Sequence, residues 1–330
     1  HERHVALKVL HPEIAQAIGS ERFLREMKIT ARLTHPHILP LLDSGESESV
    51  LYYTMPFVEG ESLRERLDRD RQLPLEDALR LAAEIADALG SAHRHNVIHR
   101  DIKPENILIE EGHAVVADFG IARAVSEVGT EQLTETGMSV GTPSYMSPEQ
   151  ASGERSIDGR SDVYALGCVL YEMLAGQVPF TGPSVESVVR QHLIEEPRSV
   201  LQIRSAVPDT VAATLHRSLA KNPADRQTNA DAFAAELRAE AATIVSGSSE
   251  TATATPYPYH TFGAIVGSLL VLLAAIYGLV IFFGLPDWVI AMAAVIAVAG
   301  SPVLIFTGHV ERHRTAKIPI KTGGALGKVR

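Results

Sequence analysis

The stretch that decides the fold is His99-Arg100-Asp101-Ile102-Lys103-Pro104-Glu105-Asn106, and the turn Asp118-Phe119-Gly120 follows twelve residues after its asparagine. A carboxylate, an ammonium group and an amide thus stand within six residues, and the turn adds a second carboxylate. Carboxylate and amide oxygens are ligands that a hard cation such as Mg²⁺ prefers. Together these groups can bring a hydroxyl, a metal ion and a phosphoryl group to one place.

The two motifs, H-R-D-x-x-x-x-N and D-F-G, resemble the catalytic loop and the metal-binding turn of protein kinases. With further motifs in the same order, about residues 5–243 resemble a eukaryotic-type (Hanks-type) Ser/Thr protein kinase of bacteria. The resemblance implies an α+β fold with two lobes, in which the C-terminal lobe is mostly helical and the N-terminal lobe is incomplete. It also implies transfer of the γ-phosphate of ATP to Ser and Thr hydroxyls of protein substrates in bacterial signalling. The cation would be Mg²⁺, with Mn²⁺ as an alternative.

The resemblance assigns a role to each polar residue of the two motifs. Asp101 would orient the acceptor hydroxyl and take its proton, and Lys103 would neutralise charge on the moving phosphoryl group. Asn106 and Asp118 would bind both the nucleotide phosphates and the metal. The lysine favours Ser and Thr as acceptors, because tyrosine kinases usually carry arginine chemistry in this loop. Small-molecule phosphotransferases of the aminoglycoside type usually have Gly where this chain has Arg100.

The run Val5–Leu10 is apolar apart from one lysine and predicts a buried strand. Alternation along a strand places Ala6 and Lys8 on the same face. The run resembles the V-A-I-K strand of kinases. By that resemblance Lys8 would hold the α- and β-phosphates of ATP, and Ala6 would lie against the adenine.

Helical spacing of apolar residues predicts a helix from Ser20 to about Leu33, with Glu26 beside its apolar stripe. By resemblance Glu26 would pair with Lys8 and hold it on the phosphates. The alternative is a surface pair of Glu26 with Arg22, worth a few tenths of a kcal/mol.

The segment after the strand Leu51–Met55 is expected to be the hinge between the lobes. By resemblance Met55 would be the gatekeeper residue, and the backbone of Pro56 and Val58 would hydrogen-bond the adenine edge. Glu59 or Ser62 would meet the ribose. The helix 75–95 would then support the catalytic loop that follows it.

Residues 121–149 form a polar loop that ends in Gly141-Thr142-Pro143-Ser144-Tyr145-Met146-Ser147-Pro148-Glu149, similar to the substrate-docking segment and A-P-E motif of kinases. Thr142 would help to read a Ser or Thr acceptor. Thr134 and Thr136 are the expected autophosphorylation sites, and Thr130 is a weaker candidate. An added phosphate could pair with Arg100 and order the loop.

Two further resemblances concern the framework of the C-terminal lobe. Asp162 resembles the aspartate that anchors the backbone of the catalytic loop, and Arg226 resembles the arginine that pairs with Glu149. The one cysteine, Cys168, excludes an intrachain disulfide and is expected to be a small buried residue. The pair His35 and His37 does not predict a metal site, since a third ligand is missing.

The C-terminal part of the chain changes in composition after the expected kinase domain, residues 1–243. A Ser-, Thr- and Gly-rich segment, 244–260, predicts a flexible linker. Two runs without charged residues, 261–284 and 288–307, would span roughly 35 and 30 Å as helices, enough to cross a bilayer twice. The tail, 308–330, is basic while the turn between the runs has no basic residue. The positive-inside rule therefore predicts a two-pass protein of the cytoplasmic (inner) membrane, with the kinase domain and the tail in the cytoplasm.

The remaining expectations concern partners and completeness. The formal net charge of −10 argues against nucleic acid as a partner. A homodimer would allow phosphorylation in trans. The chain begins at His1 without Met, and the Gly-rich loop should precede Val5. We therefore expect an N-terminally truncated sequence that binds ATP poorly by itself. The alternative to an active kinase is a pseudokinase-like scaffold tethered to the membrane.

Overall fold

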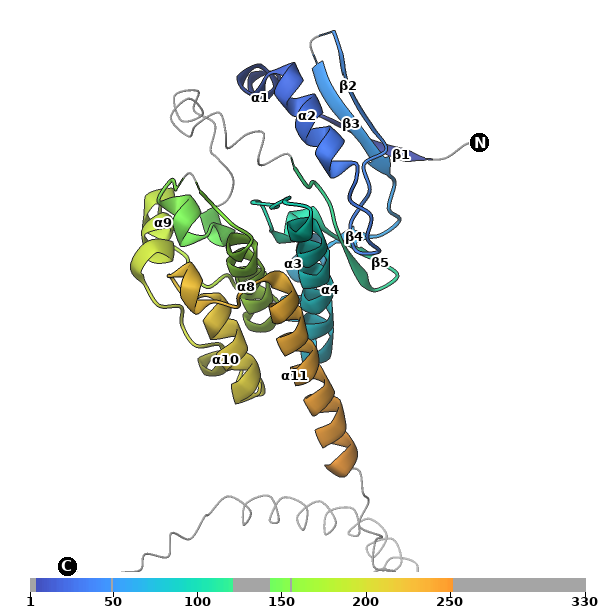
Figure 1. The fold of residues 1–330 in the computed structure, drawn as a ribbon. Helices are drawn as coiled ribbons and strands as arrows, with labels where there is room; N and C mark the ends of the chain where they lie inside the picture. Colours follow the sequence, from blue (N-terminus) through green and yellow to red (C-terminus); the bar gives the residue numbers. More distant parts are fainter. Residues whose placement is uncertain (1–3, 49, 121–142, 155, 252–330) are drawn as a thin grey trace, which may run out of the picture. The chain divides into compact units, whose positions relative to one another are not determined.

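The computed structural model describes residues 4–48, 50–120, 143–154 and 156–251 (Figure 1). The chain divides into one unit that spans His1–Ser249 and a second that spans Glu250–Arg330. The first unit combines two small sheets with a set of helices.

The N-terminal part of the domain is an antiparallel three-stranded sheet covered by two helices. Its strands are β1 (Val5–Val9), β2 (Asp43–Ser47) and β3 (Val50–Pro56), in the order β1-β3-β2. The helices α1 (Pro12–Ile18) and α2 (Ser20–Thr30) lie against this sheet (Figure 1). Phe23 and Met27 of α2 pack on Leu51 and Tyr53 of β3, which gives this part its own small core. The predicted helix 20–33 is therefore present and ends slightly earlier than expected.

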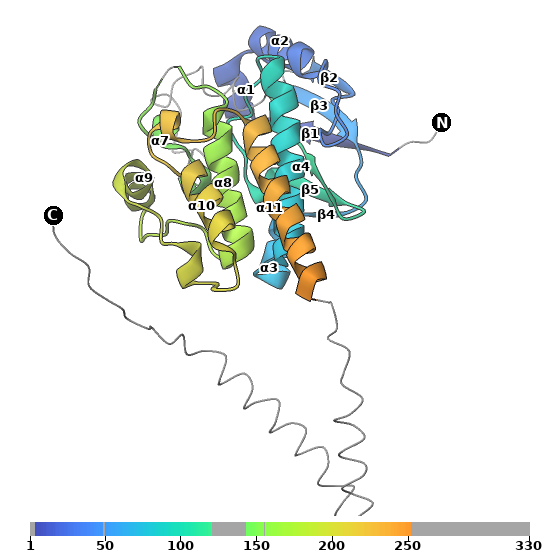
Figure 2. The ribbon, with the colours of Figure 1, turned by 60° about the horizontal axis from the view of Figure 1, so that its bottom comes forward.

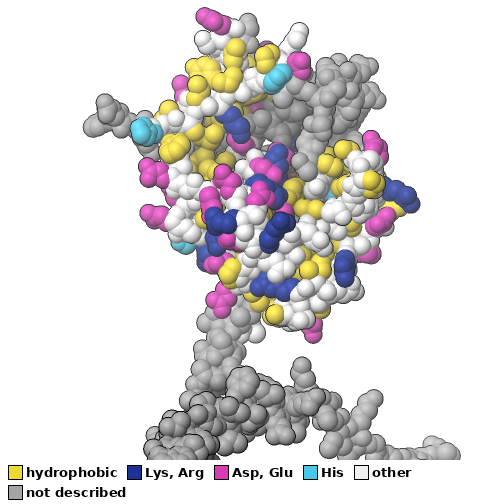
Figure 3. Space-filling view, turned by 180° about the vertical axis from the view of Figure 1, so that it is seen from behind, with side chains coloured by type: hydrophobic (Ala, Val, Ile, Leu, Met, Phe, Trp, Pro, Cys, Tyr) yellow, Lys and Arg dark blue, Asp and Glu magenta, His cyan; other side chains and the backbone are white. Residues whose placement is uncertain are grey.

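The prediction that Val5–Leu10 is a buried strand was wrong. Among the described residues β1 pairs only with β3, so it is an edge strand. Val5, Leu7 and Val9 alternate onto its outer face, and Leu7 is 62% exposed. Figure 3 shows hydrophobic side chains gathered over this part of the surface. Hydrophobic composition identified the strand correctly, but composition alone does not say how many of its faces are covered.

A second antiparallel sheet, of order β4-β5-β6, begins the C-terminal part of the domain. Its strands are β4 (Glu61–Ser62), β5 (Ile107–Glu110) and β6 (His113–Val116). The helices α3 (Leu63–Asp70) and α4 (Leu75–Arg94) follow β4, and the 3-10 turn η1 (Pro104–Asn106) precedes β5. The catalytic motif therefore lies in the connection between a long helix and this sheet. The rest of the domain consists of η2 (Pro143–Tyr145), α7 (Pro148–Ala151), α8 (Arg160–Ala175), α9 (Val185–Ile194), η3 (Val200–Gln202), α10 (Asp209–Ser218), η4 (Pro223–Asp225) and α11 (Ala230–Thr251).

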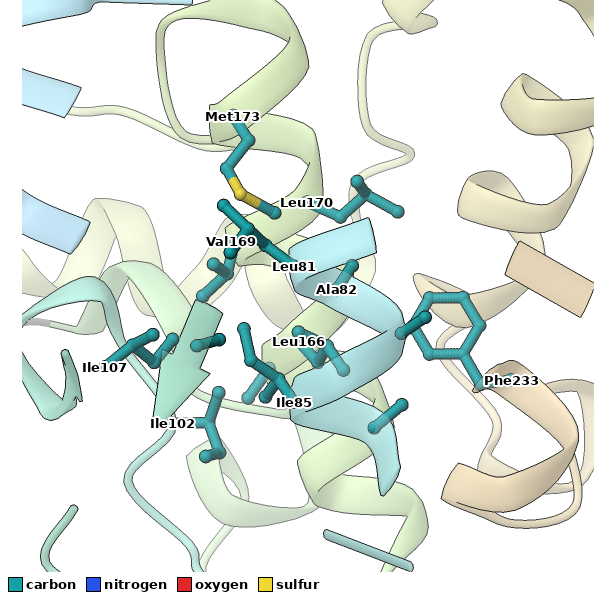
Figure 4. Close-up of a cluster of buried hydrophobic side chains, with 14 of the residues drawn as sticks. Leu81, Ala82, Ile85, Ile102, Ile107, Leu166, Val169, Leu170, Met173 and Phe233 are labelled. Carbon is teal, nitrogen blue, oxygen red and sulfur yellow. The ribbon is translucent and has the colours of Figure 1, made fainter. Parts of the chain in front are cut away.

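The main core lies where α4 and α8 pack together, with α11 beside α4 (Figure 2). Every residue of α8 from Ser161 to Ala175 is buried, as expected for a helix at the centre of a domain. Figure 4 shows Leu81 and Ile85 of α4 against Leu166 and neighbouring side chains of α8. Ile102 and Ile107 join the same cluster. One apolar side chain within the catalytic motif and one directly after it are thus buried in the core.

The helix α11 extends to Thr251, so the first part of the predicted linker 244–260 is helical. Adding a residue to an existing helix is easier than starting one, and a glycine such as Gly247 costs only about 1 kcal/mol. The rest of that segment lies outside the described residues, as do the two uncharged runs and the basic tail. Within the described residues, the helices lack the combination of length and apolar character that a bilayer crossing requires.

Candidate active site

The catalytic loop is held by a buried carboxylate. Asp162 accepts hydrogen bonds from the backbone N–H groups of His99 and Arg100, at 2.9 and 2.8 Å, and its Oδ2 lies 2.8 Å from His93 Nε2. Arg100 has a φ of 69°, a conformation that costs a non-glycine residue about 1–3 kcal/mol. The two hydrogen bonds that the backbone donates to Asp162 help to hold it there. Burial alone would raise the pKa of Asp162, but the hydrogen bond from His93 and the nearby imidazoles bring it below its ordinary value.

Three polar residues of the loop are brought together. Lys103 Nζ lies 2.7 Å from Asp101 Oδ2. The amide nitrogen of Asn106 donates to the backbone oxygen of Asp101 at 2.7 Å and to its Oδ2 at 3.0 Å. Because the nitrogen is turned toward Asp101, the amide oxygen of Asn106 is turned away from it, and an amide oxygen is a ligand type that suits Mg²⁺.

The D-F-G turn is fastened to this loop at several points. The backbone N–H of Ala117 donates to the backbone oxygen of Asn106 at 2.9 Å, and His99 Nε2 lies 2.8 Å from the oxygen of Ala117. The rings of His99 and Phe119 meet edge to face, with their centroids 4.6 Å apart. Asp118 itself has a φ of 65°. The two motifs that are separate in sequence are therefore joined by hydrogen bonds and a ring contact.

Asp118 joins the two parts of the domain. Lys8 Nζ of β1 donates to Asp118 Oδ2, and the hydroxyl of Tyr53 of β3 donates to Asp118 Oδ1 at 2.6 Å. The cross-strand pairs Lys8 with Tyr53 and Ala6 with Met55 put these four side chains on one face of the sheet. Burial, together with the charge of Asp118, raises the pKa of Tyr53, so its phenol stays a hydrogen-bond donor.

The expected pair between Lys8 and Glu26 is not formed in this structure, since the ammonium group of Lys8 lies on Asp118. The flexible side chain of a lysine can reach more than one carboxylate, and sequence spacing does not choose between them. Glu26 is buried on α2, and its Oε1 lies 3.7 Å from Nε of Arg25.

The residues expected to meet the nucleotide base follow at the end of β3. Met55 and Pro56 are half-buried at the end of the strand, Val58 is half-buried beyond it, and Glu59 is exposed. The hydroxyl of Ser62 accepts a hydrogen bond from the backbone N–H of Glu65 and thereby caps α3. Ser62 and Glu59 were the two residues considered for the ribose. Ser62 already caps a helix, and Glu59 does not.

Glu149 and Arg226 form a two-pronged buried ion pair, with N–O distances of 2.7 and 2.8 Å. Burial alone would raise the pKa of Glu149, but hydrogen bonds and charge from Arg226 bring it below its ordinary value. The side-chain amide of Gln150 donates to the backbone oxygen of Arg100 at 2.8 Å, which connects this pair to the catalytic loop. Thr134, Thr136 and Thr142 lie outside the described residues.

Sequence reasoning missed two polar groups beside the loop. Tyr53 stands two residues before Met55, so strand alternation could have placed it on the face of the site. Arg64 of α3 lies 3.0 Å from Glu105 of the catalytic motif and 2.8 Å from Glu172 of α8. Only the tertiary fold brings Arg64 of α3 to these carboxylates of η1 and α8, so spacing along the chain gives no signal for it.

Comparison with known proteins agrees with this geometry. The model of the protein kinase domain family matches residues 1–237. The chain belongs to the protein kinase domain family. This confirms the resemblance drawn from the sequence at the level of the family, and the mixed helical and sheet structure fits the bilobal kinase fold.

The chain is 41% identical over 251 residues to the serine/threonine-protein kinase PknB of Mycobacterium leprae, which covers 74% of this chain and 39% of that protein. It is 41% identical over 245 residues to a probable serine/threonine-protein kinase, CE0033, of Corynebacterium efficiens, covering 71% and 37%. It is 39% identical over 248 residues to the serine/threonine-protein kinase pkn3 of Myxococcus xanthus, covering 72% and 45%. The chain thus spans less than half the length of these curated relatives.

Proposed function

We propose that this chain is a Ser/Thr protein kinase that transfers the γ-phosphate of ATP to hydroxyl groups of protein substrates. The observation that carries the proposal is the contact of Lys8 with Asp118, across 110 residues of sequence, beside a loop in which Asp101, Lys103 and Asn106 already touch. The names of the relatives given above, two serine/threonine-protein kinases and one probable serine/threonine-protein kinase, support the same conclusion.

The polar residues of the catalytic loop have separate roles in the proposed reaction. Asp101 orients the acceptor hydroxyl and takes its proton, a role that typically contributes 10²–10⁴-fold to the rate. Lys103, held on Asp101, neutralises charge on the phosphoryl group as it moves. The hydrogen bonds from the loop backbone to Asp162 hold these groups in place, and placement is most of what phosphoryl transfer requires of a protein.

The residues fit a magnesium ion that binds together with a nucleotide. Mg²⁺ is commonly held by one or two carboxylates plus substrate phosphates, not by a cage of protein ligands. Asp118 offers a carboxylate and Asn106 an amide oxygen, and no cluster of three or more His, Cys, Asp or Glu side chains among the described residues could hold a metal alone. When bound, the ion neutralises negative charge on the phosphates.

A transfer assay with labelled ATP tests the proposal directly. The Asp101→Asn variant should lose at least about 100-fold in the rate of phosphate incorporation into a protein acceptor, because the amide cannot take the proton. Asp209→Asn, the same chemical change at an exposed position in the first turn of α10, should leave the rate unchanged. Equal rates for wild type and Asp101→Asn would contradict the assignment and favour a scaffold without transferase activity.

We further propose control by autophosphorylation of the loop that contains Thr134 and Thr136, with a homodimer allowing phosphorylation in trans. The sequence supports this, since Arg100 precedes the catalytic aspartate and can pair with an added phosphate. After incubation with ATP, mass spectrometry should find phosphate on one of these threonines. Phosphate found only elsewhere in an active enzyme would argue against this form of control.

We also propose a two-pass anchor in the cytoplasmic membrane. Its support is the sequence: two uncharged runs, 261–284 and 288–307, each long enough for a bilayer core, and a basic tail after them. A hairpin of this kind keeps the kinase domain in the cytoplasm, where ATP is available.

A further inference from the structure

Tyr53 makes a contact that the proposed reaction has not used. Its side chain is buried, with 3% of the residue exposed, and its hydroxyl donates to Asp118 Oδ1 at 2.6 Å. Leaving a buried hydroxyl without a partner is unfavourable, so this hydrogen bond constrains both groups. The bond is also charge-assisted, which makes it stronger than a bond between neutral groups.

The sheet register explains why the phenol reaches this carboxylate. Tyr53 stands directly opposite Lys8 in the pairing of β1 with β3, so their side chains leave the sheet on the same face. Lys8 donates a hydrogen bond to Oδ2 of Asp118, and Tyr53 donates one to Oδ1. The orientation of the carboxylate is therefore fixed at both of its oxygens.

The two donors differ in what a nucleotide would do to them. In the proposed function Lys8 binds the phosphates of ATP, and its ammonium group must leave Asp118 or share it. Tyr53 has a buried side chain with fewer rotatable bonds than lysine, and the proposed reaction gives it no such second task. Among the described residues it is then the donor that keeps Asp118 in place while the nucleotide is bound.

A hydrogen bond from Tyr53 leaves room for a cation. Each carboxylate oxygen carries two lone pairs. Oδ1 can therefore accept the hydrogen bond from the phenol with one lone pair and bind a metal ion with the other. Groups that orient a metal ligand without touching the metal typically change affinity by 10–100-fold when they are removed.

We propose that Tyr53 is a positioning residue that holds the Asp118 carboxylate in the orientation that binds Mg²⁺ of the Mg²⁺–nucleotide complex. The inference rests on the proposed function for the identity of the ligand. It concerns metal affinity, however, and not the transfer step.

The test compares Tyr53→Phe with Tyr52→Phe in the whole protein. Both variants lose one hydroxyl from the same strand, but Tyr52 faces the other side of the sheet, where its hydroxyl lies over Gly45. The melting temperature is measured against Mg²⁺ concentration at a fixed, saturating concentration of a non-hydrolysable ATP analogue. We expect the Mg²⁺ midpoint to rise about 10-fold or more in Tyr53→Phe and to stay unchanged in Tyr52→Phe.

The possible results distinguish a role of Tyr53 in Mg²⁺ binding from a role in folding alone, and they distinguish both from the proposed kinase activity. A lower melting temperature in Tyr53→Phe with an unchanged Mg²⁺ midpoint would overturn it, because Tyr53 would then only support the fold. A shifted midpoint in a protein that transfers no phosphate would support the inference while the kinase proposal fails. A wild-type protein without any Mg²⁺-dependent stabilisation would overturn both.

Discussion

At the scale of single residues, the domain buries a charged pair, Glu149 and Arg226, and gives both members specific partners. Glu149 and Arg226 are 5% and 0% exposed in their side chains. Arg226 also donates to three backbone oxygens, and its guanidinium lies 4.8 Å from the ring centre of Tyr164. Such a pair fixes geometry, and breaking it is costly because one charge stays buried.

Arg226→Met should therefore lower the free energy of unfolding by about 3–5 kcal/mol, since it leaves the Glu149 carboxylate buried without its partner. Urea denaturation measures the change. The double variant Glu149→Gln, Arg226→Met should recover part of the loss. Arg217→Met removes an arginine whose pair with Glu236 is 48% and 32% exposed, and it should cost less than about 1 kcal/mol. Equal losses for Arg226→Met and Arg217→Met would contradict this account of the buried pair.

His192 gives the domain a pH-dependent stability. Burial, with the charge of Lys221, lowers its pKa to about 4, whereas an unfolded chain has a histidine pKa near 6.5. Its Nδ1 lies 2.9 Å from the hydroxyl of Tyr164, and its ring meets Phe180 edge to face. Between these two pKa values the unfolded chain binds a proton that the folded domain does not, so stability falls as the pH falls.

The unfolding free energy should accordingly decrease by up to about 1.4 kcal/mol per pH unit from pH 6.5 toward pH 4 because of this one group. Urea titrations of wild type and His192→Gln at pH 7, 6 and 5 measure the slope. The variant should show a flatter dependence. The same slope in both proteins would mean that other groups determine the acid sensitivity.

The sequence predicted the site residues that belong to local motifs more completely than those set by tertiary packing. Asp101, Lys103 and Asn106 meet because six residues of one loop hold them, so their spacing is informative by itself. The partner of Lys8 could not be chosen from spacing, because Glu26 and Asp118 both offer carboxylates. Strand alternation could have placed Tyr53 on the face of the site, but spacing does not identify its hydrogen-bond partner, Asp118, which lies 65 residues further along the chain.

At the scale of the elements, α8 controls how closely the C-terminal helices approach. Gly167 faces α10 so tightly that a Cβ atom at this position would lie 2.3 Å from the hydroxyl of Ser218 and 3.1 Å from its Cβ. Glycine is thus present for packing, although it weakens a helix by about 1 kcal/mol relative to alanine.

Gly167→Ala should destabilise the domain by about 1–3 kcal/mol, because overpacking outweighs the better helix propensity of alanine. Thermal or urea unfolding measures the effect. Adding Ser218→Gly should restore part of the lost stability, since it removes the atoms that clash. A stabilised Gly167→Ala variant would show that α8 and α10 are not in such close contact.

The ends of helices were predicted correctly, to within a residue, where a local sequence signal marks them. Pro74 precedes α4 and the predicted helix 75–95 ends only one residue early, at Arg94. The burial of β1 and the end of α11 were predicted incorrectly. Edge position and helix extension depend on what neighbouring segments cover, which no local pattern encodes.

At the scale of the whole molecule, the motifs predicted the kinase family and the bilobal fold because several of them occur in the right order. The two uncharged runs predict a membrane anchor, and both runs lie outside the described residues. The full chain should therefore remain in the membrane fraction after high salt and alkaline washing. Protease added from the outer side should leave both the kinase domain and a tag at Arg330 intact. Release of the protein by salt alone would contradict the anchor.

The central claim is spatial: a lysine near the start of the chain and the catalytic motifs a hundred residues later line one nucleotide site. An ATP derivative with a reactive acyl group on its terminal phosphate transfers that group to lysines that lie beside the phosphates. We predict that mass spectrometry finds the acyl group on Lys8 and Lys103, that excess ATP with Mg²⁺ suppresses both, and that the exposed Lys28 reacts without such protection. Labelling of Lys8 that excess ATP leaves unchanged, or no labelling of Lys8 at all, would contradict the claim.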